Sequence, residues 1–508
     1  MTTNAFQLYK QEIINSLVPK QILEEWNLQT NHKKVVMICH DQDLDRRVAQ
    51  QIETLNTLGM QVLLVCLAKS SESSVEKVHD LFYIHRFGLS QIIPDCIAYW
   101  SFYKRYYYIE NTIHRLNFRL RTIPFSEQDK STPSIRTFAK KYRVTVKNLL
   151  KRSILLPVNY LYKKKVFTRL NSLLYNFHLA LKYRPKGIYM PLPFDLVFYN
   201  TAKPYKANLV ISYDLPSLKA GALLAEEKGV PFLYDAHEFY YEQKAFSSLQ
   251  KKIMMEVEQE YIKKCSAVIT INDTFAELMK KKYNISLPYI IHNVSRMSPT
   301  YKSNVLREML NISKNDTIGL YQGGVLKNRN IKEMIRGVLA LKRNDFHLVI
   351  LGIYDPLFKK EIETMIRGNK NIHLLEAVSQ EDLIRISSSA DFGIIPYPAC
   401  DFNTTYCTPN KMFEFIQAEL PILYNKHLFQ VKKMLSEFQE CAIEADFSSA
   451  KSISRNLEKM IRLDKKQAKE ALRQQKNKFS WEQESPIFIN IIQTLFAQNE
   501  KNLSSFGS

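Results

Sequence analysis

The sequence predicts an α/β fold with two doubly wound domains. Short apolar runs, typical of buried strands, alternate with longer stretches of helical periodicity in two separate series. Strands that alternate with helices form parallel sheets covered by helices on both faces. The length of 508 residues and a hydrophobic content of 45% suffice for two cores of domain size.

The first series follows a polar segment, residues 1–30, which we expect to form a helical extension. We expect its strands at residues 34–39, 60–67, 208–213, 230–235, 267–271 and 289–291. We expect its helices at residues 45–58, 215–228, 249–264 and 274–282. Together these elements predict an N-terminal domain of residues 31–300, interrupted by a helical insertion at about residues 90–186.

The second series begins after a loosely patterned stretch, residues 295–303, which is typical of a linker. We expect its strands at residues 317–321, 346–351, 372–375, 392–395 and 421–424. They predict a C-terminal domain of residues 301–476, followed by a last helix and tail in residues 477–508. Two doubly wound domains place a ligand in the cleft between them, outside the carboxyl ends of the strands.

Composition excludes several classes of protein. No apolar run reaches the 18 residues that a membrane-spanning helix needs, and the N-terminus lacks the apolar core of a signal peptide. The seven cysteines are scattered and contain no Cys-x-x-Cys pair, which predicts reduced thiols rather than disulfides or a zinc site. We therefore expect a cytoplasmic protein.

The net charge of +21 is concentrated in one segment. Residues 101–186 hold 20 lysines and arginines against 3 acidic residues, a net charge of +17. Seven aromatic residues crowd residues 99–109, and an apolar stripe follows a basic group made of Lys163, Lys164, Lys165 and Arg169. Aromatic residues and cations beside an apolar stripe suit the surface of an anionic membrane. The alternative is that the stripe packs on the first domain while the charges are solvated.

The most informative motif is residues 408–418, between two expected strands. Pro409 ends a loop, and a short helix opens near Asn410. The opening of a helix suits a phosphate, because free backbone N–H groups and the positive end of the dipole point outward. Lys411 adds a positive charge there, and Glu414 lies one turn further, where a carboxylate can accept hydrogen bonds from a ribose diol. The motif indicates a nucleotide site; the alternative is an ordinary amphipathic helix between two strands.

The stretch PNKMFEFIQAELPIL also resembles the donor-binding segment of the large family of retaining glycosyltransferases with the GT-B fold, the family 4 type. This resemblance implies two Rossmann-like domains, a nucleotide-sugar donor, and transfer with retention to a lipid-linked or polysaccharide acceptor. It implies a role in bacterial surface polysaccharide synthesis, peripheral to the inner face of the cell membrane, and no metal or other cofactor. Glu414 matches the second of two glutamates typical of the family, but Tyr406 stands where the first is usual.

The resemblance extends to the start of the second domain. Gly323 and Gly324 follow an expected strand, and glycines there let the backbone approach a ligand closely. Arg329 matches a basic residue that reaches the donor diphosphate. A second basic residue is often found where Gly324 stands, so Lys327 is a candidate to replace it. Three further positions match family positions at the cleft: Gly352, Ala377 and Val378. Asn403, in the loop before Tyr406, is expected to reach the sugar.

In the first domain, His237 ends an expected strand at the edge of the cleft, where the family has a functionally important histidine. Glu238 is a lesser candidate beside it on the acceptor side. Asp45 and Arg47 resemble the family's Asp-x-Arg-Val at the first helix; Arg47 faces the cleft or, alternatively, Asp45 only caps the helix. The glycine-rich loop that usually precedes them is replaced by Cys39-His-Asp-Gln-Asp43.

The resemblance implies electrostatic catalysis without a metal, in which Lys411, Arg329 and the helix opening stabilise the departing diphosphate while His237 orients the sugar or the acceptor. Two rival functions remain. A catalytically inactive partner subunit is suggested by Tyr406 and Gly324. A polyanion- or nucleic-acid-binding protein is suggested by the net charge, but the charge is confined to one segment and no nucleic-acid motif is present, so no nucleic acid is expected as a partner.

Overall fold

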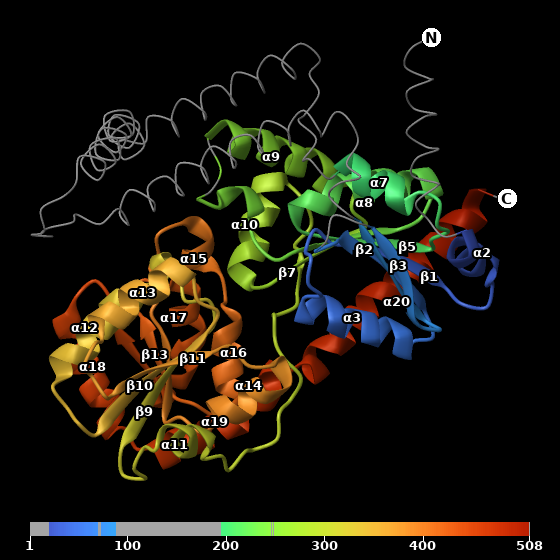
Figure 1. Ribbon diagram of the computed structural model, residues 1–508. Coiled ribbons are helices and arrows are strands. Elements are labelled where there is room, and N and C mark those ends of the chain that lie inside the picture. The colour runs from blue at the N-terminus through green and yellow to red at the C-terminus, as the bar shows by residue number, and fades with distance from the viewer. Residues whose placement is uncertain (1–19, 70–72, 88–194, 245, 247, 507–508) are drawn as a thin grey trace, which may run out of the picture. The chain divides into compact units, whose positions relative to one another are not determined.

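The computed structural model describes residues 20–69, 73–87, 195–244, 246 and 248–506. These residues form two sheets, each covered by helices on both faces (Figure 1), and both sheets belong to one compact unit of the chain. The predicted basic segment, with Lys163, Lys164, Lys165 and Arg169, lies outside the described residues. Among the helices that are described, none is long and apolar enough to cross a membrane.

The first sheet has eight strands in the order β3-β4-β2-β1-β5-β6-β7-β8. These are β1 (Lys34–Ile38), β2 (Gln61–Leu67), β3 (Ser74–His79), β4 (Phe82–Phe87), β5 (Leu209–Tyr213), β6 (Phe232–Ala236), β7 (Ala267–Thr270) and β8 (Tyr289–Ile290). All neighbours are parallel except β3 and β4. The sequence reading missed the β3–β4 hairpin, because β3 is an exposed edge strand without the apolar run of a buried one.

Seven helices accompany this sheet: α2 (Lys20–Leu28), α3 (Arg46–Thr57), α7 (Asp195–Ala202), α8 (Asp214–Lys228), α9 (Ser248–Tyr261), α10 (Asp273–Tyr283) and α20 (Trp481–Phe506). Helices α3 and α20 share one core with the strands, in which Ile52 and Phe488 pack near Val35 and Val62. The C-terminal helix α20 therefore packs on the first sheet although it follows the second in the chain.

The second sheet has six parallel strands in the order β11-β10-β9-β12-β13-β14. They are β9 (Thr317–Gln322), β10 (Phe346–Gly352), β11 (Ile372–Glu376), β12 (Phe392–Ile395), β13 (Ile422–Asn425) and β14 (Ala442–Ala445). Strand β14 was not predicted: only its last residue is fully buried, so it lacks an apolar run.

Helices cover this sheet on both faces. Those sharing one core are α12 (Ile331–Leu341), α13 (Pro356–Met365) and α18 (Ala450–Arg462). Those sharing the other are α11 (Val305–Leu310), α14 (Gln380–Ser387), α16 (Asn410–Gln417), α17 (Phe429–Leu435) and α19 (Lys465–Gln475). The short helix α15 (Phe402–Tyr406) lies between β12 and α16 in the chain. Of the five short 3₁₀ turns in the described residues, the one used below is η5 (Lys327–Arg329).

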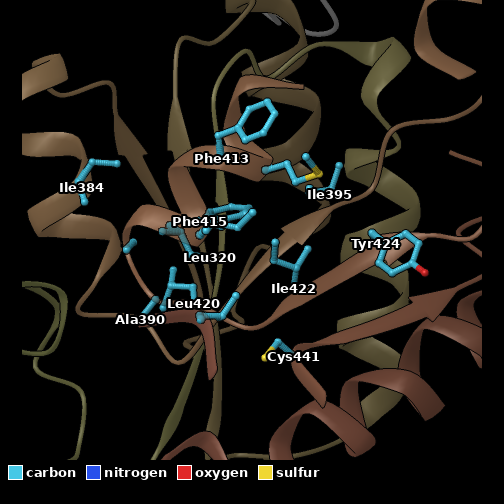
Figure 2. Close-up of a cluster of buried hydrophobic side chains, with 14 of the residues drawn as sticks. Leu320, Ile384, Ala390, Ile395, Phe413, Phe415, Leu420, Ile422, Tyr424 and Cys441 are labelled. Atoms are coloured by element: carbon cyan, nitrogen blue, oxygen red, sulfur yellow. The ribbon is translucent and has the colours of Figure 1, made fainter. Parts of the chain in front are cut away.

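Packing holds α16 rigidly against the second sheet. Figure 2 shows Phe413 and Phe415 of this helix among buried side chains such as Leu320 and Ile422. Strand β12 has a glycine, Gly393, directly beneath Phe415, and a Cβ at that position would lie 2.4 Å from the ring. Because the apolar face of α16 is locked in this way, its polar residues at the N-terminal end are held in defined positions.

The strand order also determines where ligands can bind. In the first sheet the order reverses around β1, which lies between β2 and β5; in the second it reverses around β9, which lies between β10 and β12. Ligands of open α/β sheets bind outside the carboxyl ends of strands at such reversals. The described residues therefore match the predicted fold, two doubly wound α/β domains.

Candidate functional site

A pocket of about 620 Å³ opens at the carboxyl ends of strands from both sheets. Most of the residues predicted for the site line it. They are His237, Glu238, Gly323, Gly324, Arg329, Gly352, Ala377, Val378, Asn403, Pro409, Asn410, Lys411 and Glu414. The lining also includes Asp214, Asn293, Gln322 and Tyr397, which the sequence analysis did not single out.

The glycine turn after β9 forms one wall of this pocket. Gly323 has a φ of +112°, in the region that favours glycine, and a Cβ there would lie 3.3 Å from the Lys411 Nζ. Gly352 lets the turn approach β10, because a Cβ at Gly352 would lie only 1.8 Å from the Gly323 carbonyl oxygen. Both glycines are therefore required by close backbone and side-chain packing around the pocket.

Lys411 is a buried lysine whose amino group forms no ion pair with the residues that the structure describes. Its Nζ makes no hydrogen bond with any described residue and lies 4.1 Å and 4.2 Å from the ring centres of Tyr321 and Tyr397. Burial, and then the charge of Arg329, lower the pKa of Lys411 well below its usual value. A buried ammonium without a counter-ion is costly, so this position is suited to receive an anion from a ligand.

A second cation and a helix end reinforce this preference. The Arg329 guanidinium lies 4.2 Å from the Tyr397 ring centre, and forms no ion pair with the residues that the structure describes. Helix α16 opens beside Lys411, and its N-cap residue, Pro409, supplies no side-chain hydrogen bond to the helix end. Two cations and the positive end of a helix dipole together form a binding place for phosphate groups.

Glu414 lies one turn further into α16 and is already hydrogen-bonded at both carboxylate oxygens. Oε1 accepts from Arg46 Nη1 at 2.9 Å, and Oε2 accepts from Gln322 Nε2 at 2.6 Å. Arg46 also donates to the Asn293 carbonyl oxygen at 3.2 Å. A ribose diol that bound Glu414 would compete with Arg46 for Oε1. Arg46 and Glu414 are 368 positions apart in the chain.

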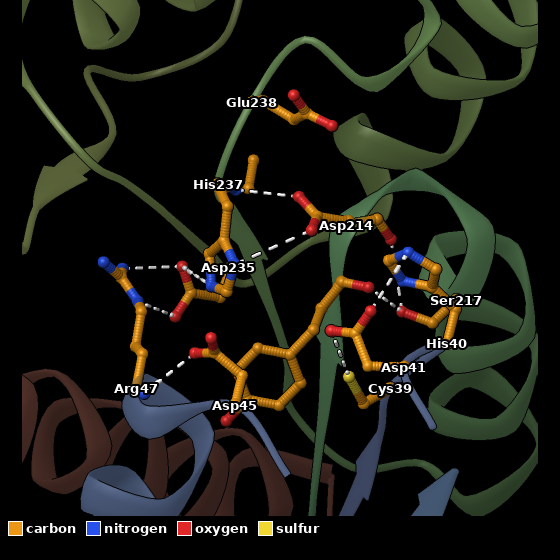
Figure 3. Close-up of polar contacts among 12 residues, drawn as sticks. Cys39, His40, Asp41, Asp45, Arg47, Asp214, Ser217, Asp235, His237 and Glu238 are labelled. Carbon is orange, nitrogen blue, oxygen red and sulfur yellow. Dashed lines mark hydrogen bonds and ion pairs between the residues drawn. The ribbon is translucent and has the colours of Figure 1, made fainter. Parts of the chain in front are cut away.

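His237 lies between two buried carboxylates (Figure 3). Its backbone N–H donates to Asp214 Oδ1 at 2.8 Å, its Nδ1 lies 3.6 Å from Asp214 Oδ2, and its Nε2 lies 3.6 Å from Asp235 Oδ1. Burial alone would lower the pKa of His237, but Asp214 and Asp235 outweigh it and raise this pKa to about 9. The imidazole is therefore a cation at neutral pH, at the wall of the same pocket.

Asp214, one of the two carboxylates beside His237, has a strained backbone. It begins α8 with a φ of +55°, in the left-handed region that non-glycine residues rarely adopt. Burial raises the pKa of Asp214 to about 7 although His237 acts to lower it. The strain is held by the backbone hydrogen bond from His237, so the two residues form one structural unit.

The structure corrects the expectations for Arg47 and Asp45. Arg47 is 1% exposed and does not face the pocket, because its Nε and Nη2 bind the two oxygens of Asp235 at 2.9 Å and 2.7 Å. Burial alone would raise the pKa of Asp235, but the charge of Arg47 outweighs it and holds this pKa well below its usual range. Asp45 caps α3 by accepting from the Arg47 backbone N–H at 2.8 Å, which is the alternative considered from the sequence.

Asn403 lines the pocket but its amide is committed to protein partners rather than free for a sugar. Its Nδ2 donates to Glu238 Oε2 at 3.0 Å, and its Oδ1 accepts from the Phe239 backbone N–H at 3.1 Å. Burial raises the pKa of Glu238. Asn403 therefore positions Glu238, and the expectation of a direct sugar contact from Asn403 is not supported by this geometry.

Two predicted donor contacts lie outside the pocket lining. Lys327 is 64% exposed and bonds to Glu361 Oε1 at 2.6 Å on the surface, so it does not replace the basic residue missing at Gly324. Tyr406 packs its ring against those of Phe402 and Phe429, at centroid distances of 4.9 Å and 5.4 Å. Tyr406 thus makes apolar ring contacts at the position where the family resemblance implies a carboxylate.

One group of possible metal ligands is present in the part of the chain that the structure describes. The ligand atoms of Cys39, His40 and Asp41, after β1, lie within 4.8 Å of one another (Figure 3). Burial, and then Asp41, raise the pKa of the Cys39 thiol, which favours the neutral form over the thiolate that metals prefer. None of the three lines the main pocket, and the expectation that no metal takes part remains a prediction.

Some of the unpredicted residues had a signal in the sequence. Asp214 directly follows the strand expected at residues 208–213, and Gln322 follows the one at 317–321, so the rule of strand carboxyl ends would have found both. Arg46 had no such signal. Adjacent residues of a helix differ by about 100° in direction, and only packing decides which of Arg46 and Arg47 reaches Glu414.

No protein-family model matches the sequence, and no curated protein matches it. Solved structures do match. Sucrose-phosphate synthase from Thermosynechococcus elongatus is 13% identical with a TM-score of 0.59, and the match covers 92% of this chain and 100% of the other. HepE from Anabaena, solved with UDP, is 12% identical with a TM-score of 0.53, covering 93% and 100%. A glycosyltransferase from Rickettsia africae is 11% identical with a TM-score of 0.52, covering 92% and 99%. At these identities the match concerns the fold, and it confirms the GT-B architecture.

Proposed function

We propose that this protein is a glycosyltransferase that takes a sugar from a nucleotide-sugar donor bound in the pocket at the N-terminus of α16. The observation that carries the proposal is Lys411, a buried ammonium without a counter-ion in a pocket of about 620 Å³. A nucleoside diphosphate supplies that counter-ion. The likeness in fold to HepE, which was solved with UDP and with UDP-glucose, supports this class of ligand.

Each part of the donor has a candidate partner. Lys411, Arg329 and the α16 N-terminus would bind the diphosphate, and Glu414 would bind the ribose diol after Arg46 moves away. Ala377 and Val378, in the loop after β11, line the same pocket and would contact the nucleobase. The sugar would then extend toward His237 and Glu238 at the first sheet.

The charges in the pocket suit the breaking of a sugar–phosphate bond. As the acceptor oxygen bonds to the anomeric carbon and the bond to the diphosphate breaks, negative charge grows on the departing oxygen. Preorganised cations stabilise that charge without a metal, and the acceptor proton can pass to the departing phosphate. The cationic His237 would hydrogen-bond the sugar or the departing oxygen, since Asp214 and Asp235 keep it protonated. We propose retention of configuration on the basis of the family resemblance.

A thermal-shift screen of nucleotide sugars, followed by an assay of donor hydrolysis, tests this function. We expect stabilisation by one nucleoside diphosphate and its sugars and slow release of free sugar in the absence of an acceptor. Lys302 offers a matched control, because it is exposed and forms no hydrogen bond or ion pair with another described residue. Lys302→Gln should behave as wild type. If no nucleotide diphosphate binds, the proposal is wrong.

A catalytically inactive partner subunit is the second candidate, and it is favoured by one observation. Tyr406 and Gly324 stand where the family resemblance leads us to expect a carboxylate and a cation, and Lys327 does not replace the latter. Binding of a nucleotide sugar without hydrolysis or transfer, over a range of acceptors, would favour this function over the enzyme.

The acceptor and the site of action are proposed from the resemblance and the basic segment. We propose a lipid-linked or polysaccharide acceptor, in bacterial surface polysaccharide synthesis, at the inner face of the membrane. Residues 99–186 would hold the protein there, although they lie outside the described residues. Co-sedimentation with anionic and neutral vesicles at two salt concentrations tests this; binding should be confined to anionic vesicles and weaken with salt. Equal binding to both kinds of vesicle would refute it.

A further inference from the structure

A second polar pocket, of about 380 Å³, lies at the amino ends of the first sheet's strands, away from the carboxyl ends where the candidate site lies. It is bordered by the end of α2, the starts of β1 and β5, and the end of α8, elements that lie close together in Figure 1. Its lining includes Lys34, Lys206, Lys228 and His32 but no aspartate or glutamate. The pocket is therefore strongly cationic.

Lys34 is the buried cation of this pocket. It is 4% exposed, and its Nζ donates only to the Trp26 carbonyl oxygen, with the Trp26 ring centre 5.7 Å away. No carboxylate among the described residues pairs with it. Burial, and then the charge of Lys206, lower the pKa of Lys34. The geometry thus leaves a buried ammonium beside a second one, with nothing negative between them.

The other two lysines also lack an anionic partner in the described part of the chain. Lys228 Nζ donates to the Lys203 carbonyl oxygen at 2.9 Å, while the nearby Glu227 pairs with Lys203 at 3.1 Å. Lys206 is exposed, and its amino group forms no hydrogen bond or ion pair with the residues that the structure describes. Three ammonium groups that border one pocket repel one another unless an anion lies between them.

Neutral donors complete the pocket. The Asn208 side-chain oxygen accepts from the Lys34 backbone N–H at 2.8 Å, which holds the Asn208 side chain at this end of the sheet. The NH₂ group of Asn208 donates no hydrogen bond to the described residues. Thr30 adds a hydroxyl. Several cations with hydrogen-bond donors around them favour an anion that carries more than one negative charge over several oxygens, which is the chemistry of a phosphate group.

We propose that this pocket is a binding site for a phosphate-bearing ligand, separate from the candidate donor site. The shared chemistry is the phosphate group, whether it belongs to a soluble phosphorylated molecule or to the headgroup of an anionic lipid. The pocket is larger than inorganic phosphate needs and leaves room for an organic group that carries the phosphate. This proposal does not depend on the proposed glycosyltransferase activity.

Calorimetric titration of the full chain with inorganic phosphate and pyrophosphate tests the site. The key variant is Lys206→Gln, which removes one charge from an exposed side chain without breaking a hydrogen bond or ion pair among the described residues, so it should fold as wild type. Lys302→Gln is the matched control, and Lys411→Met reports phosphate bound at the donor site. We expect Lys206→Gln to weaken one class of phosphate binding at least fivefold while neither other variant affects that class. Phosphate binding that only Lys411→Met reduces, or none at all, would overturn the proposal.

Vesicle binding then separates the two sources of phosphate. Vesicles of phosphatidic acid in phosphatidylcholine are compared with phosphatidylcholine alone, for wild type and Lys206→Gln. If Lys206→Gln weakens both phosphate and vesicle binding, the ligand is a lipid headgroup. If it weakens phosphate binding but leaves vesicle binding unchanged, the ligand is a soluble phosphorylated molecule.

Discussion

Replacing Lys411 by methionine should stabilise the free protein while it weakens nucleotide binding. Methionine keeps the unbranched length of the lysine stem and removes the charge. The amino group is buried, has no hydrogen bond with a described residue, and lies over the rings of Tyr321 and Tyr397. Opposite effects on stability and on affinity are what an unpaired buried charge held for a ligand predicts.

The expected magnitudes follow from these contacts. Burying an ammonium costs several kcal/mol, and two cation–π contacts offset about 1–2 kcal/mol each. The methionine retains favourable contacts with the rings. We therefore expect the free protein to gain about 2 kcal/mol, or roughly 4–8 °C in Tm for a domain of about 150–250 residues. Losing a charge-assisted hydrogen bond to phosphate costs about 1.5–3 kcal/mol, which weakens nucleotide binding roughly 10- to 150-fold.

The pH dependence has a defined sign. Because the pKa of Lys411 is lowered on folding, the folded state binds fewer protons than the unfolded state between the lowered pKa and the usual value near 10.5. Stability of the wild type therefore rises with pH in that window, relative to Lys411→Met. The advantage of the variant should shrink as the pH increases.

Thermal unfolding with and without nucleoside diphosphate, together with calorimetry, measures both effects, and Lys302→Met serves as the exposed control. If Lys411→Met lowers the Tm of the free protein, the ammonium has a stabilising partner and our account of it is wrong. If the variant binds nucleotide as well as wild type does, Lys411 lies outside the donor site.

Four further outcomes are expected. Glu414→Gln should weaken nucleotide binding by about 1.5–3 kcal/mol, because a neutral amide accepts poorly from a diol; unchanged affinity in calorimetry would remove Glu414 from the site. Arg46→Met should instead tighten nucleotide binding several-fold by releasing Glu414 Oε1, whereas weaker binding would assign Arg46 itself to the ligand. His237→Gln should lower turnover more than affinity, and should abolish the fall in stability that the wild type shows as the pH rises from about 6.5 through about 9, since the raised pKa stabilises the fold only while His237 is protonated. Turnover should survive chelation by EDTA; loss of turnover that a divalent metal restores would direct attention to Cys39, His40 and Asp41.

Local patterns in the sequence were enough to predict the α/β fold with two parallel sheets. Parallel strands buried on both faces read as continuous apolar runs, so β1, β2, β5, β9 and β10 are evident without a structure. The edge strands β3 and β14 carry no such run and were missed. The same reasoning holds for the helix N-terminus at Asn410, where a proline, a lysine and a glutamate one turn later are neighbours in sequence as well as in space.

By itself, then, the sequence determined which residues stand at the ends of strands and on α16, because those positions depend on periodicity and spacing within a few residues. Only the tertiary structure decided what those residues contact. It placed Arg46 rather than Arg47 against Glu414, enclosed His237 between Asp214 and Asp235, and gave the Asn403 amide to Glu238. These partners come from distant parts of the chain, and whether a charge is paired, buried or free depends on the packing of both sheets, which no local pattern encodes.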